Sequence, residues 1–207
     1  MDLAAAERAD LADLLDTLTA EQWESLSLCE GWTVRTVVAH VVSYEELGTV
    51  GGWWRFLRCG MSFDRANAVS LRAYTDRTPD ELCALLRRHL RPSGLTAINK
   101  GAVGLTDGMI HHQDIRRPLG LHRRIPEERL VPALHSAVRA PALPSRKLVR
   151  GLRLEATDVG WTHGDGPLAR GAGEALLLTI AGRPAAARDL DGEGARLVCA
   201  RLDAEIP

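Results

Sequence analysis

The stretch that decides the fold lies at residues 27–44 and reads SLCEGWTVRTVVAHVVSY. Gly31 interrupts this stretch, and Thr33 is a residue type that commonly caps the first turn of a helix. After Thr33, apolar side chains recur at the spacing of one helix face, at Val34, Val37, Val38, Val41 and Tyr44. The β-branched pairs are also compatible with a strand, but the length and the flanking residues favour a helix.

The segments around this helix predict further helices. Leucines recur at helical spacing between residues 3 and 18, and residues 78–81, Thr-Pro-Asp-Glu, combine an N-cap, a proline at the first position and a glutamate at the third. Another helix is expected from about residue 99 to 116, ending before Pro118, and one more after Pro126. Four substantial amphipathic helices within about 120 residues are typical of an antiparallel bundle.

The sequence pattern changes after the prolines at positions 141 and 144. Residues 151–157 alternate like a strand, 161–167 read as a turn between strands, 173–182 as a short apolar helix, and 196–202 alternate again. We therefore expect an α+β chain that is mainly α, with a helical bundle over residues 1–143 and a small α+β domain over 144–207.

Composition excludes several classes of protein. The chain of 207 residues has 26 basic and 27 acidic side chains and a net charge of −1, which argues against a nucleic-acid binder and a polybasic membrane binder. Its four cysteines are scattered without a C-x-x-C pair, so no disulfide framework or zinc ribbon is expected. Neither a signal peptide nor an apolar run long enough for a membrane span is evident, which predicts a cytoplasmic protein.

One constellation of residues indicates a metal site. Asp107 and His111 stand at positions i and i+4 of a predicted helix, so they lie on one face, and Asp114 lies on nearly the same stripe. A carboxylate and an imidazole in this arrangement need one further ligand from a facing helix, for which His40 is the candidate. Three protein ligands leave one coordination position open, as in catalytic sites. The alternatives are an ordinary core histidine at 40 and a solvated ion pair between Asp107 and His111.

Other candidates are weaker. Cys29 lies just before a helix start, where a thiolate is favoured, but no activating partner is evident in the sequence and a buried structural thiol is the preferred interpretation. The chain contains no G-x-G-x-x-G, Walker A or G-x-S-x-G motif.

Three motifs resemble those of one known family. Residues 27–40, SLCEGWTVRTVVAH, resemble the LCxGWTVRDVVAH opening of the mycothiol-dependent maleylpyruvate isomerases, a branch of the DinB-like four-helix-bundle superfamily. Residues 107–120, DGMIHHQDIRRPLG, look like the second motif of this family, an acidic residue and a histidine four apart followed by an aspartate. Residues 161–166 and 181–183 look like parts of its small C-terminal domain.

The resemblance implies a DinB-like bundle that holds a divalent metal, usually zinc, through His40, Asp107 and His111. Family members use mycothiol, the low-molecular-weight thiol of actinobacteria, and the Arg- and Ala-rich composition is compatible with that source. Their best-known activity is the isomerisation of maleylpyruvate, and relatives include S-transferases. The isomerases typically have Glu where this chain has Asp107, and their substrate-binding arginine has no assigned counterpart here.

We therefore expect a metal- and mycothiol-dependent enzyme, monomeric or homodimeric, in which a metal-bound thiolate adds to a small electrophile and leads to isomerisation or S-transfer. The alternatives are a non-catalytic metal or small-ligand binding protein and a metal-dependent hydrolase with Asp114 as general base. Asp114 is assigned either to a hydrogen bond with a metal-bound histidine or to cofactor binding. Arg116 is also assigned to cofactor binding, with favourable interaction at the helix C-terminus as its alternative.

Overall fold

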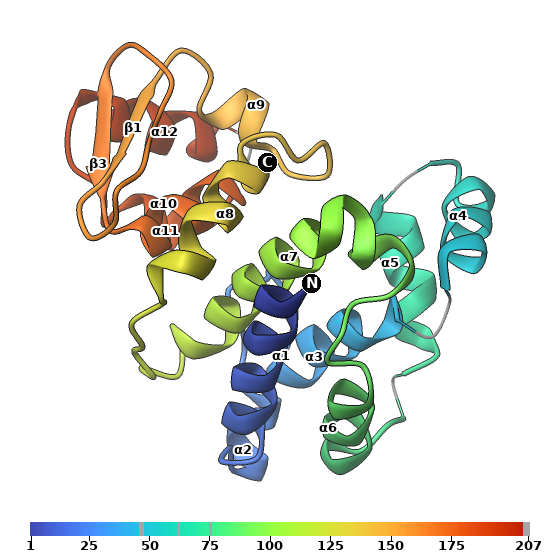
Figure 1. Cartoon of the computed structure of the whole chain (residues 1–207). Helices are drawn as coiled ribbons and strands as arrows, with labels where there is room; N and C mark the ends of the chain where they lie inside the picture. The colour runs from blue at the N-terminus through green and yellow to red at the C-terminus, as the bar shows by residue number, and fades with distance from the viewer. Residues whose placement is uncertain (46–47, 62, 75, 205–207) are drawn as a thin grey trace. The chain divides into compact units, whose positions relative to one another are not determined.

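The computed structural model describes residues 1–45, 48–61, 63–74 and 76–204 (Figure 1). The chain forms two compact units, Met1–His122 and Arg123–Pro207.

Unit 1 is helical. Its elements are α1 (Asp2–Leu15), α2 (Ala20–Glu24), α3 (Val34–Ser43), α4 (Gly48–Arg58), α5 (Phe63–Arg72), α6 (Pro79–Arg88), the short 3₁₀ helix η1 (Gly94–Ala97) and α7 (Ile98–Arg116). Helices α1 and α3 each pack against both α6 and α7, which makes these four helices the body of the bundle (Figure 1). The core between them is built from leucine and valine side chains that are almost completely buried.

Helix α3 begins and packs for local reasons. The Thr33 hydroxyl accepts a hydrogen bond from the backbone N–H of Thr36 at 3.3 Å and so caps the helix. All five valines of α3 are buried, on more than one side of the helix, because neighbouring helices cover it. This burial explains why β-branched residues are concentrated in a helix, since their side chains fill a close-packed core.

Helix α7 does not begin where the sequence predicts. Asn99, Lys100 and Gly101 adopt left-handed backbone conformations, with φ angles of 53°, 59° and 87°. A Cβ atom at Gly101 would lie 2.8 Å from the sulfur of Met1, and the N-terminal ammonium donates to the carbonyl of Lys100 at 2.7 Å. The regular part of the helix therefore starts after Gly101, where the N-terminus of the chain packs against it.

Unit 2 combines short helices with a small sheet. Its elements are α8 (Glu127–Ala137), α9 (Ser145–Leu148), β1 (Arg153–Ala156), β2 (Thr162–His163), β3 (Leu168–Gly171), α10 (Gly173–Ile180), α11 (Pro184–Ala187) and α12 (Glu193–Asp203). The strand order is β2-β1-β3, with β1 antiparallel to β2 and parallel to β3. In this register Leu154 lies opposite Ala169, and the apolar helix α10 packs on the sheet and on α8.

The predicted fold class, a mainly helical α+β chain with an N-terminal helical bundle and a small C-terminal unit, is confirmed. Two further local predictions were wrong: residues 196–202 belong to helix α12 and not to a strand, and the predicted turn at 161–167 contains strand β2. Their apparent alternation conceals helical spacing, because the buried side of α12 is formed by Ala195, Val198 and Leu202. The compact units divide between His122 and Arg123, before the predicted domain boundary at 143 and 144, because α8 packs against α10.

Within the described residues, no helix combines the length and the apolar character that crossing a membrane requires.

Candidate metal centre

Three potential metal ligands of unit 1 converge between α3 and α7. His40 comes from α3, and Asp107 and His111 stand one turn apart on α7. The Oδ1 atom of Asp107 lies 3.8 Å from Nε2 of His40 and 3.5 Å from Nε2 of His111. One ligand atom from each residue lies within 4.8 Å of the other two. Two imidazoles and a carboxylate are a donor set that suits zinc and related divalent ions, so these residues fit the metal implied by the sequence.

The surroundings of His40 restrict its ring. The ring lies against Trp32 and Tyr44, with centroid distances of 5.2 and 5.3 Å, and against His111 at 4.7 Å. Its side chain is 6% exposed, whereas that of Asp107 is 30% exposed. The centre is therefore enclosed on the His40 side and reached by solvent beside Asp107.

Electrostatic interactions prepare two of the three groups for coordination. Burial lowers the pKa of His40 and outweighs the opposing effect of the nearby Asp107 carboxylate, which favours the neutral imidazole that a metal needs. Burial alone raises the pKa of Asp107, but its interactions with the nearby imidazoles of His111 and His40 hold the pKa well below its usual value. For His111, burial is outweighed by Asp107, Asp114 and Cys29, which hold its pKa well above 6.5. His111 must therefore release a proton when it binds a metal.

The two histidines differ at their outer ring nitrogens. Nδ1 of His111 lies 2.9 Å from Oδ2 of Asp114, whose side chain is completely buried. Nδ1 of His40 is buried and has no hydrogen-bond partner among the described residues. Asp114 therefore holds His111 with Nε2 toward Asp107, whereas the orientation of His40 depends on the packing of aromatic rings around it.

The structure also reveals a neighbour that the sequence analysis set aside. The Cys29 thiol donates to Oδ2 of Asp114 at 3.1 Å and lies 3.8 Å from Nδ1 of His111. The backbone N–H of Leu28 donates to the carbonyl of Asp114 at 3.0 Å and joins this loop to α7. Position before a helix start was the only sequence signal for Cys29, and it could not indicate a carboxylate on a distant helix.

Arg116 lies in a different network. Its Nε–H donates to Nε2 of His112 at 2.8 Å, and Nδ1 of His112 lies 2.9 Å from Oε1 of Glu7 on α1. Its guanidinium also donates to the carbonyl of Leu121 at 3.3 Å, just beyond the end of α7. These contacts do not bring Arg116 to the three candidate ligands, and its role in cofactor binding stays a prediction.

Comparisons with known proteins agree with this architecture. Residues 4–92, which include Cys29 and His40 and end before Asp107, match the model of the mycothiol maleylpyruvate isomerase N-terminal domain. A solved histidine-to-alanine mutant of a mycothiol-dependent maleylpyruvate isomerase superposes with a TM-score of 0.61 at 16% identity, over 94% of this chain and 91% of the other. A second isomerase structure has a TM-score of 0.55 at 15% identity, with the same coverage. A search of the curated proteins found no match.

Proposed function

We propose, because residues 4–92 match the model of the mycothiol maleylpyruvate isomerase N-terminal domain, that this chain is a cytoplasmic, metal-dependent enzyme that uses mycothiol as a nucleophile toward a small electrophile. The observation that carries the proposal is the convergence of His40, Asp107 and His111 within 4.8 Å. Isomerisation and S-transfer both begin with addition of the thiol to the electrophile, and analysis of the products distinguishes them.

His40, Asp107 and His111 would hold the metal, for which zinc is proposed because its sites commonly combine imidazole and carboxylate ligands. When bound, a divalent metal supplies an electrophilic position at which a thiol readily loses its proton. Tight enclosure on the His40 side leaves the edge near Asp107 for the thiol to enter, since that carboxylate is 30% exposed. Asp107 is one methylene shorter than the usual glutamate. Its carboxylate nevertheless lies 3.8 Å from Nε2 of His40, because α7 packs against α3.

Asp114 would keep the proton of His111 on Nδ1. By accepting the Nδ1–H of His111 it leaves the lone pair at Nε2 free toward Asp107 and His40. Cys29 donates to the same carboxylate oxygen and restricts its rotation. Asp114 is also poorly placed to act as the general base of a hydrolase. Its carboxylate lies at Nδ1 of His111, whereas Asp107 lies at Nε2 of the same ring.

The role of Asp114 predicts a loss of metal affinity on substitution. Asp114→Asn should weaken metal binding about 10–100-fold without unfolding the protein, as is usual when a partner of a metal-bound histidine is altered. Competition with a chromogenic chelator measures this affinity. Glu30→Gln removes the same single negative charge at an exposed position of the Cys29 loop. This control should leave the metal affinity unchanged. Equal metal affinity in Asp114→Asn and the parent protein would remove Asp114 from the centre.

Thiol dependence tests the activity itself. Conversion of a panel of electrophiles, followed by chromatography of products, should require mycothiol and should not proceed with water as the sole nucleophile. Cys29→Ser should remain active, because the proposed nucleophile belongs to mycothiol and serine still donates to Asp114. Equal rates of conversion with and without mycothiol would instead show that the protein is a hydrolase. Tight metal binding without turnover of any electrophile would assign a non-catalytic binding protein.

A further inference from the structure

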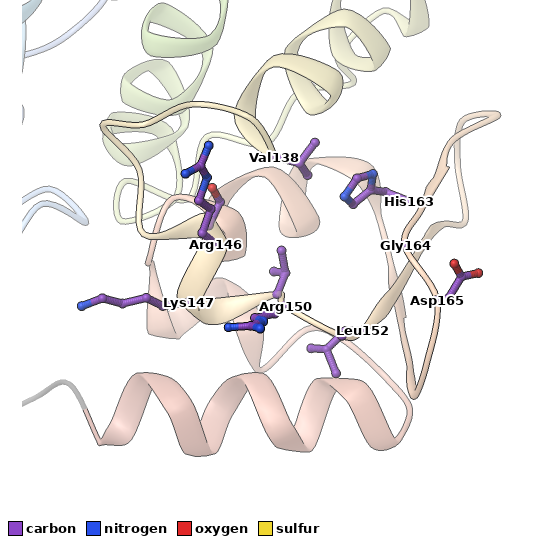
Figure 2. Close-up of a pocket in the computed structure, with 11 residues that line it drawn as sticks. Val138, Arg146, Lys147, Arg150, Leu152, His163, Gly164 and Asp165 are labelled. Atoms are coloured by element: carbon purple, nitrogen blue, oxygen red, sulfur yellow. The ribbon is translucent and has the colours of Figure 1, made fainter.

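A cavity of about 800 Å³ lies in unit 2, apart from the residues of the metal centre, which all belong to unit 1. Its walls come from the end of α8, from α9 and the residues that follow it, and from β2 and the turn after it. In the view of Figure 2, Arg146 and His163 flank Val138, while Lys147 and Asp165 extend outward at opposite ends.

The walls carry an excess of positive charge. Arg146, Lys147 and Arg150 lie within five consecutive residues, and Asp165 is the single acidic residue among the lining side chains. Across the described part of the chain, neither the Arg146 nor the Arg150 guanidinium has an ion pair or a side-chain hydrogen bond. This concentration of cations contrasts with the net charge of −1 for the whole protein. An anion placed between these groups would gain charge-assisted hydrogen bonds that the protein itself does not provide.

A buried hydroxyl is also left without a partner. Ser145 lines the cavity, its side chain is completely buried, and its Oγ atom makes no hydrogen bond within the described residues. A buried hydroxyl without a partner lowers the stability of a protein. Because Ser145 is 0% exposed, a ligand oxygen reaches its hydroxyl only when the covering wall shifts, and binding would then offset the cost of the unsatisfied group.

The remaining wall is apolar. Val138, Val149 and Leu152 line the cavity and are at most 9% exposed. Pockets for small molecules typically combine such surface with a few polar groups that fix orientation. The combination suits a molecule with a short carbon chain and an anionic end, rather than a fully hydrated inorganic ion.

We propose that this cavity binds a small organic anion, with its carboxylate or phosphate group held by Arg146 and Arg150 and hydrogen-bonded by Ser145. The guanidinium group matches the paired oxygens of both anion types. The inference does not depend on the proposed metal- and thiol-dependent activity, because it involves different residues in a different unit.

Isothermal titration of the full chain with succinate, with inorganic phosphate and with neutral succinamide tests the proposal. Succinate should bind, inorganic phosphate should bind more weakly because it has no carbon chain for the apolar wall, and succinamide should not bind. The double substitution Arg146→Gln/Arg150→Gln should weaken binding about 10- to 100-fold, the effect of losing hydrogen bonds to a charged group. Arg196→Gln removes an exposed arginine of α12 that does not line the cavity, and this variant should bind the anion like the parent protein. Binding of succinamide as tight as succinate, or an unaffected double variant, would overturn the proposal.

Two further variants separate this site from a structural role and from the metal centre. Ser145→Ala should weaken anion binding about tenfold and leave the thermal midpoint unchanged or raised, since it removes an unsatisfied hydroxyl. A lowered midpoint with unchanged anion affinity would make Ser145 structural and contradict the proposal. His40→Ala should bind the anion normally, and loss of binding in this variant would place the anion at the metal centre instead.

Discussion

Replacing His40 with alanine should abolish tight binding of a divalent metal and leave the helical bundle folded. His40 is the single candidate ligand from α3, and its loss leaves Asp107 and His111, which both come from α7. Two neighbouring ligands on one helix cannot enclose an ion from opposite sides. The fold should survive because the stability of the bundle rests mainly on packed apolar faces such as the valines of α3.

The experiment compares metal content after purification, affinity in competition with a chelator, and thermal unfolding followed by circular dichroism. His122→Ala is the matched control, because His122 is an exposed histidine of the same unit and does not belong to the candidate ligand group. This control should retain metal and stability. Retention of tightly bound metal by His40→Ala would refute the three-ligand site. Loss of the fold in His40→Ala would mean that the metal is structural rather than catalytic.

Replacing Arg8 should destabilise unit 1 more than any surface change. Its guanidinium lies 2.6 Å from Glu45, both side chains are 1% exposed, and it also donates to the carbonyl of His89. The Glu45 carboxylate further accepts hydrogen bonds from Ser93 and Thr96. Arg8→Ala leaves this carboxylate buried without its charge partner, which typically costs about 3–5 kcal/mol. Since whole proteins are stable by about 5–15 kcal/mol, the change removes a large share of the free energy of unfolding.

Urea unfolding measures the effect, with Arg87→Ala as the control. Arg87 pairs with Asp13 and Asp16 at the surface, where such pairs contribute about 0–1 kcal/mol. The double substitution Arg8→Met/Glu45→Leu should recover part of the loss, because it removes both buried charges together. An Arg8→Ala variant as stable as Arg87→Ala would show that the buried pair does not hold the unit together.

The Arg8–Glu45 pair also links stability to the site. Glu45 follows α3, and Ser93 and Thr96 lie just before α7, so one carboxylate connects the two helices that carry the candidate ligands. Arg8 adds α1 to the same network. Weakening this network should therefore loosen the spacing between His40 and Asp107 before the bundle unfolds.

The sequence was sufficient where the physics is local. Helix starts at Thr33 and Thr78 follow from side-chain caps formed within one turn, and both are present in the structure. The placement of Asp107 and His111 on one face follows from the period of the helix alone. The mainly helical class follows from apolar spacing that needs no knowledge of packing partners. Position 40 was nominated by an apolar face and by a family motif, but spacing within one helix could not show what that face meets.

Tertiary structure decided everything that depends on which segments meet. Three contacts join residues more than 35 positions apart: Cys29 with Asp114, Arg8 with Glu45, and Glu7 with His112. The last of these continues to Arg116, four residues from His112. No periodicity encodes such contacts, because they arise when helices close on a shared core and polar side chains must find partners inside it. The sequence determined helix α3, the start of α6 and the shared face of Asp107 and His111, whereas packing determined which ring nitrogen of His111 faces Asp107 and which faces Asp114.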